Sequence, residues 1–164
     1  MRSNKTKELV MTALMAALVF IATYLIRIPN PATGGYHHLG DCMIFLAVVL
    51  LGRRQGALAA GIGAALSDFL AGAAMWILPT FIIKYVMAFI MATIIKGNPW
   101  AKKRQITGAS IGGLFQVIAY TLCSALFYSP QAAIITIPNE ILQSAVGIAA
   151  FLVLSAAIPK SLRK

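Results

Sequence analysis

The chain has 164 residues, of which 60% are hydrophobic and only 18 are charged, 14 basic and 4 acidic. A soluble domain carries about 25% charged residues, whereas this chain has 11% and a mean hydropathy of +0.84. This composition excludes a soluble enzyme, a secreted domain and a disordered tail, and it indicates an integral membrane protein. A spanning helix needs about 20 apolar residues, so we expect about six spans in one transmembrane domain over residues 1–164.

The apolar runs predict an all-α protein with six transmembrane helices. The connection 27–40 contains two prolines and three glycines, which favours an ordered loop over a helix. The second and third runs are short for full spans and are separated by the turn-like Gly52–Gly56. The six predicted helices cover residues 9–26, 41–51, 57–72, 79–95, 106–127 and 139–158.

The basic residues predict the orientation of these helices. Twelve of the 14 fall in the N-terminus, in the second and fourth connections, and in the C-terminal tail. Cytoplasmic loops are enriched in lysine and arginine, so both termini are predicted to be cytoplasmic. With five or seven spans, these basic residues would no longer all fall on the same side of the membrane. Because the basic residues sit at the ends of apolar runs, they indicate orientation and no binding of nucleic acid.

Polar residues gather at the predicted outer ends of the helices, where a charge at membrane depth usually faces a cavity, a ligand or a partner. Lys84 has three possible roles: it reaches the outer interface, pairs with Asp41, Asp68 or Glu140, or contacts a ligand. Residues four apart share a helix face, and three polar pairs have this spacing. They favour an outward-facing pocket for a small polar molecule over simple interhelical hydrogen bonds. The pairs are Thr80 with Lys84, Gln116 with Tyr120, and Asn139 with Gln143.

The cytoplasmic half is rich in small residues. The first helix carries Ala13-x-x-x-Ala17, a spacing that lets helices approach closely. For this helix, docking onto another membrane protein and packing within the monomer both remain open. The small residues of 57–67 favour packing within the monomer.

Several kinds of chemistry lack a motif in this chain. There is no G-x-x-x-x-G-K-[ST] loop for ATP. The adjacent His37 and His38 do not have the spacing of metal ligands, and neither do Cys42 and Cys123. We therefore expect no cofactor, no metal ion and no catalysis.

Two stretches carry a family resemblance: GYHHLGDCMIFLAVVLLGRRQGALAAGIGAALSDFLAG and LPTFIIKYVMAFI. They resemble the S components of energy-coupling factor (ECF) vitamin transporters, and most closely the group with riboflavin and hydroxymethylpyrimidine or pyridoxine carriers. The match covers about the first 95 residues by motif and the rest by helix number. Its most specific parts are Leu39-Gly40-Asp41, Leu66-Ser67-Asp68 and Lys84.

The resemblance implies a high-affinity substrate-binding subunit in the plasma membrane of a prokaryote. Such a subunit would dock through Ala13 and Ala17 onto a transmembrane coupling subunit that works with two cytoplasmic ATPases. One cation among three carboxylates disfavours a multiply anionic ligand, so hydroxymethylpyrimidine or pyridoxine is the expected ligand. By position, the predicted ligand contacts are Tyr36, His37, Trp76, Lys84, Tyr120, Asn139 and Gln143.

Two other functions remain open at this point. One is a self-contained secondary transporter coupled to protons through Glu140 or Asp68. The other is a small membrane enzyme that uses Asp41 or Asp68 with His37 or His38.

Overall fold

The computed structural model describes the backbone of residues 2–25, 27–29 and 36–163. Within these ranges, five helices are long and apolar enough to cross a membrane. Shorter elements are the strands β1 (Arg27–Pro29) and β2 (Tyr36–His38) and the 3₁₀ helices η1 (Ala74–Trp76) and η2 (Lys160–Leu162). The long helices are α1 (Arg2–Leu25), α2 (Asp41–Leu70), α3 (Ile77–Ile94), α4 (Lys102–Phe127) and α5 (Pro130–Ala157).

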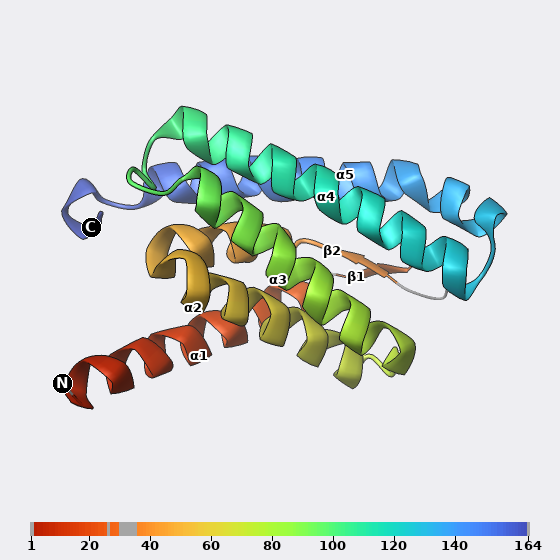
Figure 1. Cartoon of the computed structure of the whole chain (residues 1–164), viewed down its shortest axis with the longest axis horizontal. Helices are drawn as coiled ribbons and strands as arrows, with labels where there is room; N and C mark the ends of the chain where they lie inside the picture. Colours follow the sequence, from red (N-terminus) through yellow and green to blue (C-terminus); the bar gives the residue numbers. More distant parts are fainter. Residues whose placement is uncertain (1, 26, 30–35, 164) are drawn as a thin grey trace.

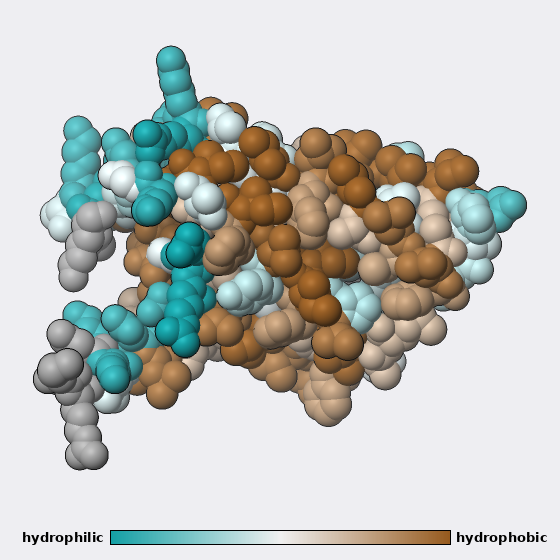
Figure 2. Space-filling view, in the orientation of Figure 1, coloured by the Kyte–Doolittle hydropathy of each residue, from teal (hydrophilic) through white to brown (hydrophobic). Residues whose placement is uncertain are grey.

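The helices pack in two layers (Figure 1). One layer contains α1, α2 and α3, and the other contains α4 and α5; α3 contacts α4, and α2 contacts α5. Both termini lie at the same end of the molecule. Figure 2 shows hydrophilic residues gathered at that end and mostly hydrophobic residues over the rest of the visible face. The connections therefore separate into one basic end and one opposite end, as a transmembrane bundle requires.

α2 unites the second and third predicted helices, but its helical path breaks at Gly52. This residue has φ 77° and ψ −168°, a conformation far from helical. A Cβ added to Gly56 would lie 2.8 Å from Cα of Val48. In a straight helix, eight residues would span about 12 Å, so the chain folds back at Gly52 and the two halves pack against each other. The prediction of six membrane crossings stays a prediction.

The predicted start of the last helix at Asn139 was wrong. α5 begins at Pro130, and Pro138 lies inside it. Oγ of Ser129 accepts a hydrogen bond from the backbone N–H of Ala132, 3.1 Å away. Serine at the N-cap followed by proline at the first helical position is a favoured helix start. The helix therefore begins nine residues before the predicted start.

The connection predicted as a loop contains a two-stranded antiparallel pair, in which Ile28 lies opposite His37. The stretch 30–35 lies outside the described residues. Backbone hydrogen bonding between β1 and β2 orders the flanks of this connection beside the start of α2.

Much of the interior between the layers is apolar and closely packed. Phe45 of α2 and Phe151 of α5 are both buried, with ring centroids 5.6 Å apart. Met87 and Met91 of α3 are fully buried beside them. Many large apolar side chains instead face outward, as expected where lipid is the solvent. They include Leu14, Ile82, Leu114, Leu122, Leu142 and Val153.

The break in α2 predicts a specific effect of Gly52→Ala. An added Cβ would meet nothing within 4 Å, but this region of φ and ψ is essentially restricted to glycine, and strain there costs about 1–3 kcal/mol. We expect the unfolding free energy in detergent to fall by that amount. The neighbouring Arg54→Ala should change it by less than about 0.5 kcal/mol. Equal stability of the parent and Gly52→Ala would contradict the reversal at this residue.

Candidate functional site

A buried ion pair lies at the centre of the polar interior. Lys84 of α3 and Asp41, in the first turn of α2, both have fully buried side chains, and Nζ of Lys84 lies 2.5 Å from Oδ1 of Asp41. The sequence analysis named Asp41, Asp68 and Glu140 as possible partners of Lys84, and the structure pairs Lys84 with Asp41. The position of Asp41 at a helix N-terminus also stabilises its negative charge.

Three further side chains complete what we call the Asp41 network, which consists of Asp41, Lys84, Gln116, Gln143 and Ser144. Nε2 of Gln116 donates to Oδ2 of Asp41 at 2.7 Å and to Oγ of Ser144 at 2.6 Å, while its Oε1 accepts from Lys84. Nε2 of Gln143 donates to Oδ2 of Asp41 at 3.2 Å. The network therefore joins α2, α3, α4 and α5.

A close approach of α5 to α2 makes these contacts possible. A Cβ on Gly147 would lie 2.7 Å from Cβ of Asp41, so only glycine fits at this crossing. Gln143 and Ser144 lie one turn before Gly147 on α5 and thus reach the carboxylate of Asp41 and the amide of Gln116.

Gln143 also connects the network to the β1–β2 pair. Its Oε1 accepts a hydrogen bond from the backbone N–H of His38 at 3.1 Å. Nδ1 of His38 in turn accepts from the N–H of Gly40 at 3.1 Å. The strand β2 is thereby held directly beside the start of α2.

Aromatic side chains lie next to the network, towards the end opposite the termini. The ring centroid of Tyr120 is 5.3 Å from Nζ of Lys84, and its hydroxyl donates to Oγ1 of Thr80 at 3.2 Å. Trp76 lies with its ring centroid 5.8 Å from that of Tyr120, 5.4 Å from Phe127 and 6.3 Å from Tyr128. Nε1 of Trp76 donates to the hydroxyl of Tyr128 at 3.2 Å. These four aromatic residues, Trp76, Tyr120, Phe127 and Tyr128, are called the Trp76 cluster.

The structure thus brings together four of the predicted ligand contacts: Trp76, Lys84, Tyr120 and Gln143. Asn139, one turn before Gln143, is exposed on α5 and is not part of the network. Tyr36 and His37 belong to β2 by backbone, but their side chains lie outside the described residues.

Sequence reasoning missed two members of the network. The sequence analysis noted Gln116 only because it lies four residues before Tyr120, and it did not mention Ser144. The position of Ser144 directly after Gln143 could have indicated its role, because two adjacent polar residues in an apolar helix point in different directions and therefore need different polar partners.

The first helix presents the predicted docking residues on its outer face. Ala13 and Ala17 are exposed, whereas Met15, Ala16 and Val19 are buried. The principal helical neighbour of α1 is α2. By contrast, most small residues of the second half of α2 are buried, namely Gly56, Ala57, Ala59, Ala60, Gly61, Gly63 and Ala64.

Among the described residues, no group of three or more His, Cys, Asp or Glu side chains is placed to hold a metal ion.

A family model described as "ECF-type riboflavin transporter, S component" matches residues 3–160. The chain belongs to this family. ECF S components associate with a transmembrane coupling subunit and ATPases. The match spans nearly the whole chain and extends the resemblance beyond the motifs of the first 95 residues.

Two individual proteins are similar to this chain. An uncharacterized protein from Pyrococcus woesei is 37% identical over 130 residues, which cover 79% of this chain and 86% of that protein. A solved structure reported as "Structure and mechanism of the S component of a bacterial ECF transporter" superposes with a TM-score of 0.78 at 19% identity. The superposition covers 98% of this chain and 99% of that chain, and it supports the S-component fold.

The buried ion pair predicts a strong and asymmetric effect on stability. Lys84→Met leaves the carboxylate of Asp41 buried without its cation, which costs about 3–5 kcal/mol. Lys84→Met combined with Asp41→Asn removes both charges and should recover most of that loss. The unfolding free energy in detergent measures both effects. The control Lys96→Met, at an exposed lysine just after α3, should shift it by less than about 0.5 kcal/mol. A double variant no more stable than Lys84→Met would contradict the pairing.

Proposed function

We propose that this protein is the substrate-binding S component of an ECF importer and that it captures a flat, uncharged heterocyclic vitamin beside the Trp76 cluster. Family membership supports the role as a vitamin-binding subunit. The arrangement of Trp76 next to the neutralised Lys84–Asp41 pair supports the chemical class of the ligand.

The Trp76 cluster offers aromatic faces for stacking. Trp76 is half-buried, and Phe127 and Tyr128 are exposed, so a ring system can reach them without unfolding a helix. Stacked aromatic pairs contribute about 0.5–1.5 kcal/mol beyond the area that they bury. A planar heterocycle suits this surface better than a flexible or highly charged molecule.

The Asp41 network determines which charges remain for a ligand. The ammonium of Lys84 is already paired with the carboxylate of Asp41, so it offers no uncompensated positive charge. An anionic ligand would have to compete with that carboxylate in a low-dielectric interior. We therefore infer a neutral ligand.

Riboflavin is our first choice within this class, because the family description names it. Hydroxymethylpyrimidine and pyridoxine, the ligands expected from the sequence, share the flat neutral ring and stay in the proposal as smaller alternatives. The pairing of Lys84 with Asp41 leaves the balance of one cation against three carboxylates unchanged, so the charge count on which that expectation rested still disfavours an anionic ligand.

The predicted contacts take different roles in this proposal. Trp76 and Tyr120 stack with the ring, and Asn139 supplies a hydrogen bond. Tyr36 and His37 stay ligand contacts predicted from the sequence. Lys84 and Gln143 act chiefly by holding Tyr120 and β2 in place.

We further propose six membrane crossings with both termini in the cytoplasm of a prokaryote. The reversal at Gly52 supports two crossings within α2, and the gathering of basic residues with both termini supports the orientation. The Trp76 cluster then faces the outside, where a vitamin arrives. The protein performs no catalysis, and its transport energy comes from the ATPases of its partners.

The stacking role of Trp76 is tested with the two tryptophans of the chain. Trp76→Leu should weaken vitamin binding about 5- to 150-fold, because stacking on an aromatic side chain is worth about 1–3 kcal/mol. Trp100→Leu, at the basic end beside Arg163, should stay within about twofold of the parent. Calorimetry with riboflavin, hydroxymethylpyrimidine and pyridoxine measures the affinities and ranks the ligands. Trp76→Leu with unchanged affinity for every bound vitamin would refute the assignment of the site.

The docking role of α1 is tested by bulky substitutions on its two faces. Ala13→Trp and Ala17→Trp should abolish co-purification with the coupling subunit and vitamin uptake, because both residues are exposed at a spacing that permits close helix approach. Vitamin affinity of the isolated subunit should remain within about twofold. Ala16→Trp, on the buried face, should instead lower the stability of the isolated subunit. Intact assembly with lost vitamin binding in Ala13→Trp would disprove the docking role.

A further inference from the structure

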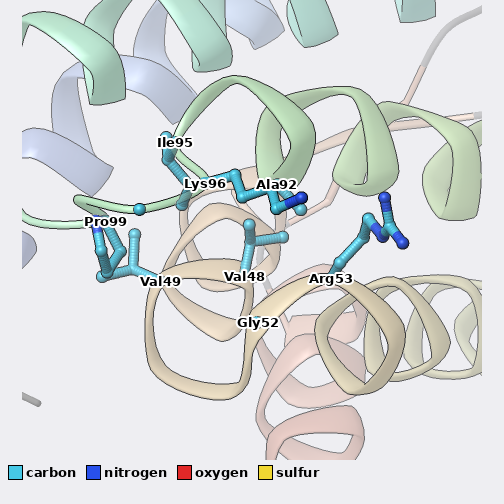
Figure 3. Close-up of a pocket in the computed structure, with 9 residues that line it drawn as sticks. Val48, Val49, Gly52, Arg53, Ala92, Ile95, Lys96 and Pro99 are labelled. Atoms are coloured by element: carbon cyan, nitrogen blue, oxygen red, sulfur yellow. The ribbon is translucent and has the colours of Figure 1, made fainter.

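A pocket lies at the basic end of the molecule, remote from the Trp76 cluster. It has a volume of about 310 Å³ and opens between the break in α2 and the end of α3 (Figure 3). This volume is at the lower end of the range of about 300–1,000 Å³ for small-molecule sites. Its lining consists of Val48, Val49, Gly52, Arg53, Ala92, Ile95, Lys96, Gly97 and Pro99.

The lining divides into an apolar floor and a cationic rim. Val48, Val49, Ala92 and Ile95 are buried and form the floor, whereas Arg53 and Lys96 are exposed. Figure 3 shows these two side chains coming from opposite walls of the pocket and extending towards the same side. Such a division suits an amphiphile with an anionic head.

Neighbouring groups hold the cations in this arrangement. Cζ of Arg53 lies 5.0 Å from the ring centroid of Phe89 on α3, so the guanidinium bridges from α2 towards the helix that ends beside Lys96. Nη1 of Arg104 donates to the backbone carbonyl of Lys96 at 2.6 Å. A third positive charge thus lies beside the backbone of Lys96, outside the residues that line the pocket.

No acidic side chain is among the residues that line the pocket. Glu8 lies at this end of the molecule, but its Oε2 accepts from Nε2 of Gln55 at 3.3 Å. Gln55 is two residues beyond Arg53, and residues with this spacing point to different sides of a helix. The positive charge at the rim is therefore not neutralised from within the pocket lining.

We propose that this pocket binds the phosphate of an anionic phospholipid, with the phosphate between Arg53 and Lys96 and the glycerol ester region on the apolar floor. Arginine and lysine donate charge-assisted hydrogen bonds to phosphate oxygens, and basic pockets between transmembrane helices bind such headgroups. A free phosphate ion would use the same cations but would leave the buried valine, alanine and isoleucine surface uncovered. The lipid is therefore the better occupant.

Native mass spectrometry of the full chain released from detergent tests this proposal. The probes are phosphatidylglycerol, zwitterionic phosphatidylcholine and inorganic phosphate. The pocket variant is Arg53→Gln with Lys96→Gln, and the matched control is Arg54→Gln with Lys103→Gln, which removes the same charge from exposed positions that do not line the pocket. Arg53→Gln alone serves if the double variant does not fold.

We expect the parent and the control to bind one phosphatidylglycerol with affinities within about twofold of each other. The pocket variant should bind it about tenfold or more weakly, and Arg53→Gln alone at least about threefold more weakly, because charge-assisted hydrogen bonds are lost. Equal weakening in control and pocket variants would mean that only net charge matters, and would overturn the proposal. Equal binding of phosphatidylcholine would overturn the selection for an anionic head. Inorganic phosphate bound as tightly as the lipid, and lost in the pocket variant, would reassign the site to free phosphate.

Discussion

The arrangement of the helices depends on one buried pair of opposite charges. A lone charge in the interior of a membrane protein is costly, and removing one partner of a buried pair leaves that cost uncompensated. Asp41 meets its cation from α3 and its amide donors from α4 and α5, so these elements have to stop at one common depth. A sliding of any helix by one turn would break at least one of these bonds. The pair and its amide partners thus fix the register of four helices in an interior that is mostly apolar.

Much of this architecture could be predicted from composition and from the lengths of apolar runs. Lys84 stood out because it is the only charge in its run, but the sequence could not choose among three carboxylates, since that choice depends on how α3 faces α2. The sequence predicted a turn over the five residues Gly52–Gly56, whereas the structure reverses the chain direction at the single residue Gly52. Asn139 and Gln143 lie four residues apart, but Asn139 is exposed and Gln143 is buried. The sequence could not show this difference, because burial depends on which helices pack against each part of α5. The adjacency of Ser144 to Gln143 marks Ser144 as a candidate, but its contact with Gln116 arises only when α4 and α5 are assembled.

The two ends of the molecule have opposite chemical character. Towards one end, Lys84 and Asp41 pair with each other, and the aromatic rings of Phe127 and Tyr128 are exposed. At the other end, cations surround a pocket without acidic lining residues. Between them, α1 has one principal helical neighbour and leaves a face of small residues open. With the proposed roles, ligand capture, contact with lipid and contact with a partner subunit would use separate surfaces of a very small protein.

The wide spacing of the network along the chain has a consequence for biosynthesis. Asp41 precedes Lys84 by 43 residues and Gln143 by 102. The ribosome therefore delivers the carboxylate to the membrane long before its cation, and the last amide follows only when α5 emerges. The nascent helices have to remain together in a place where water or the insertion machinery still solvates an unpaired charge. Release into lipid becomes less costly when the cation arrives and again when the amides follow, so the network that orders the finished structure also disfavours the release of unfinished copies.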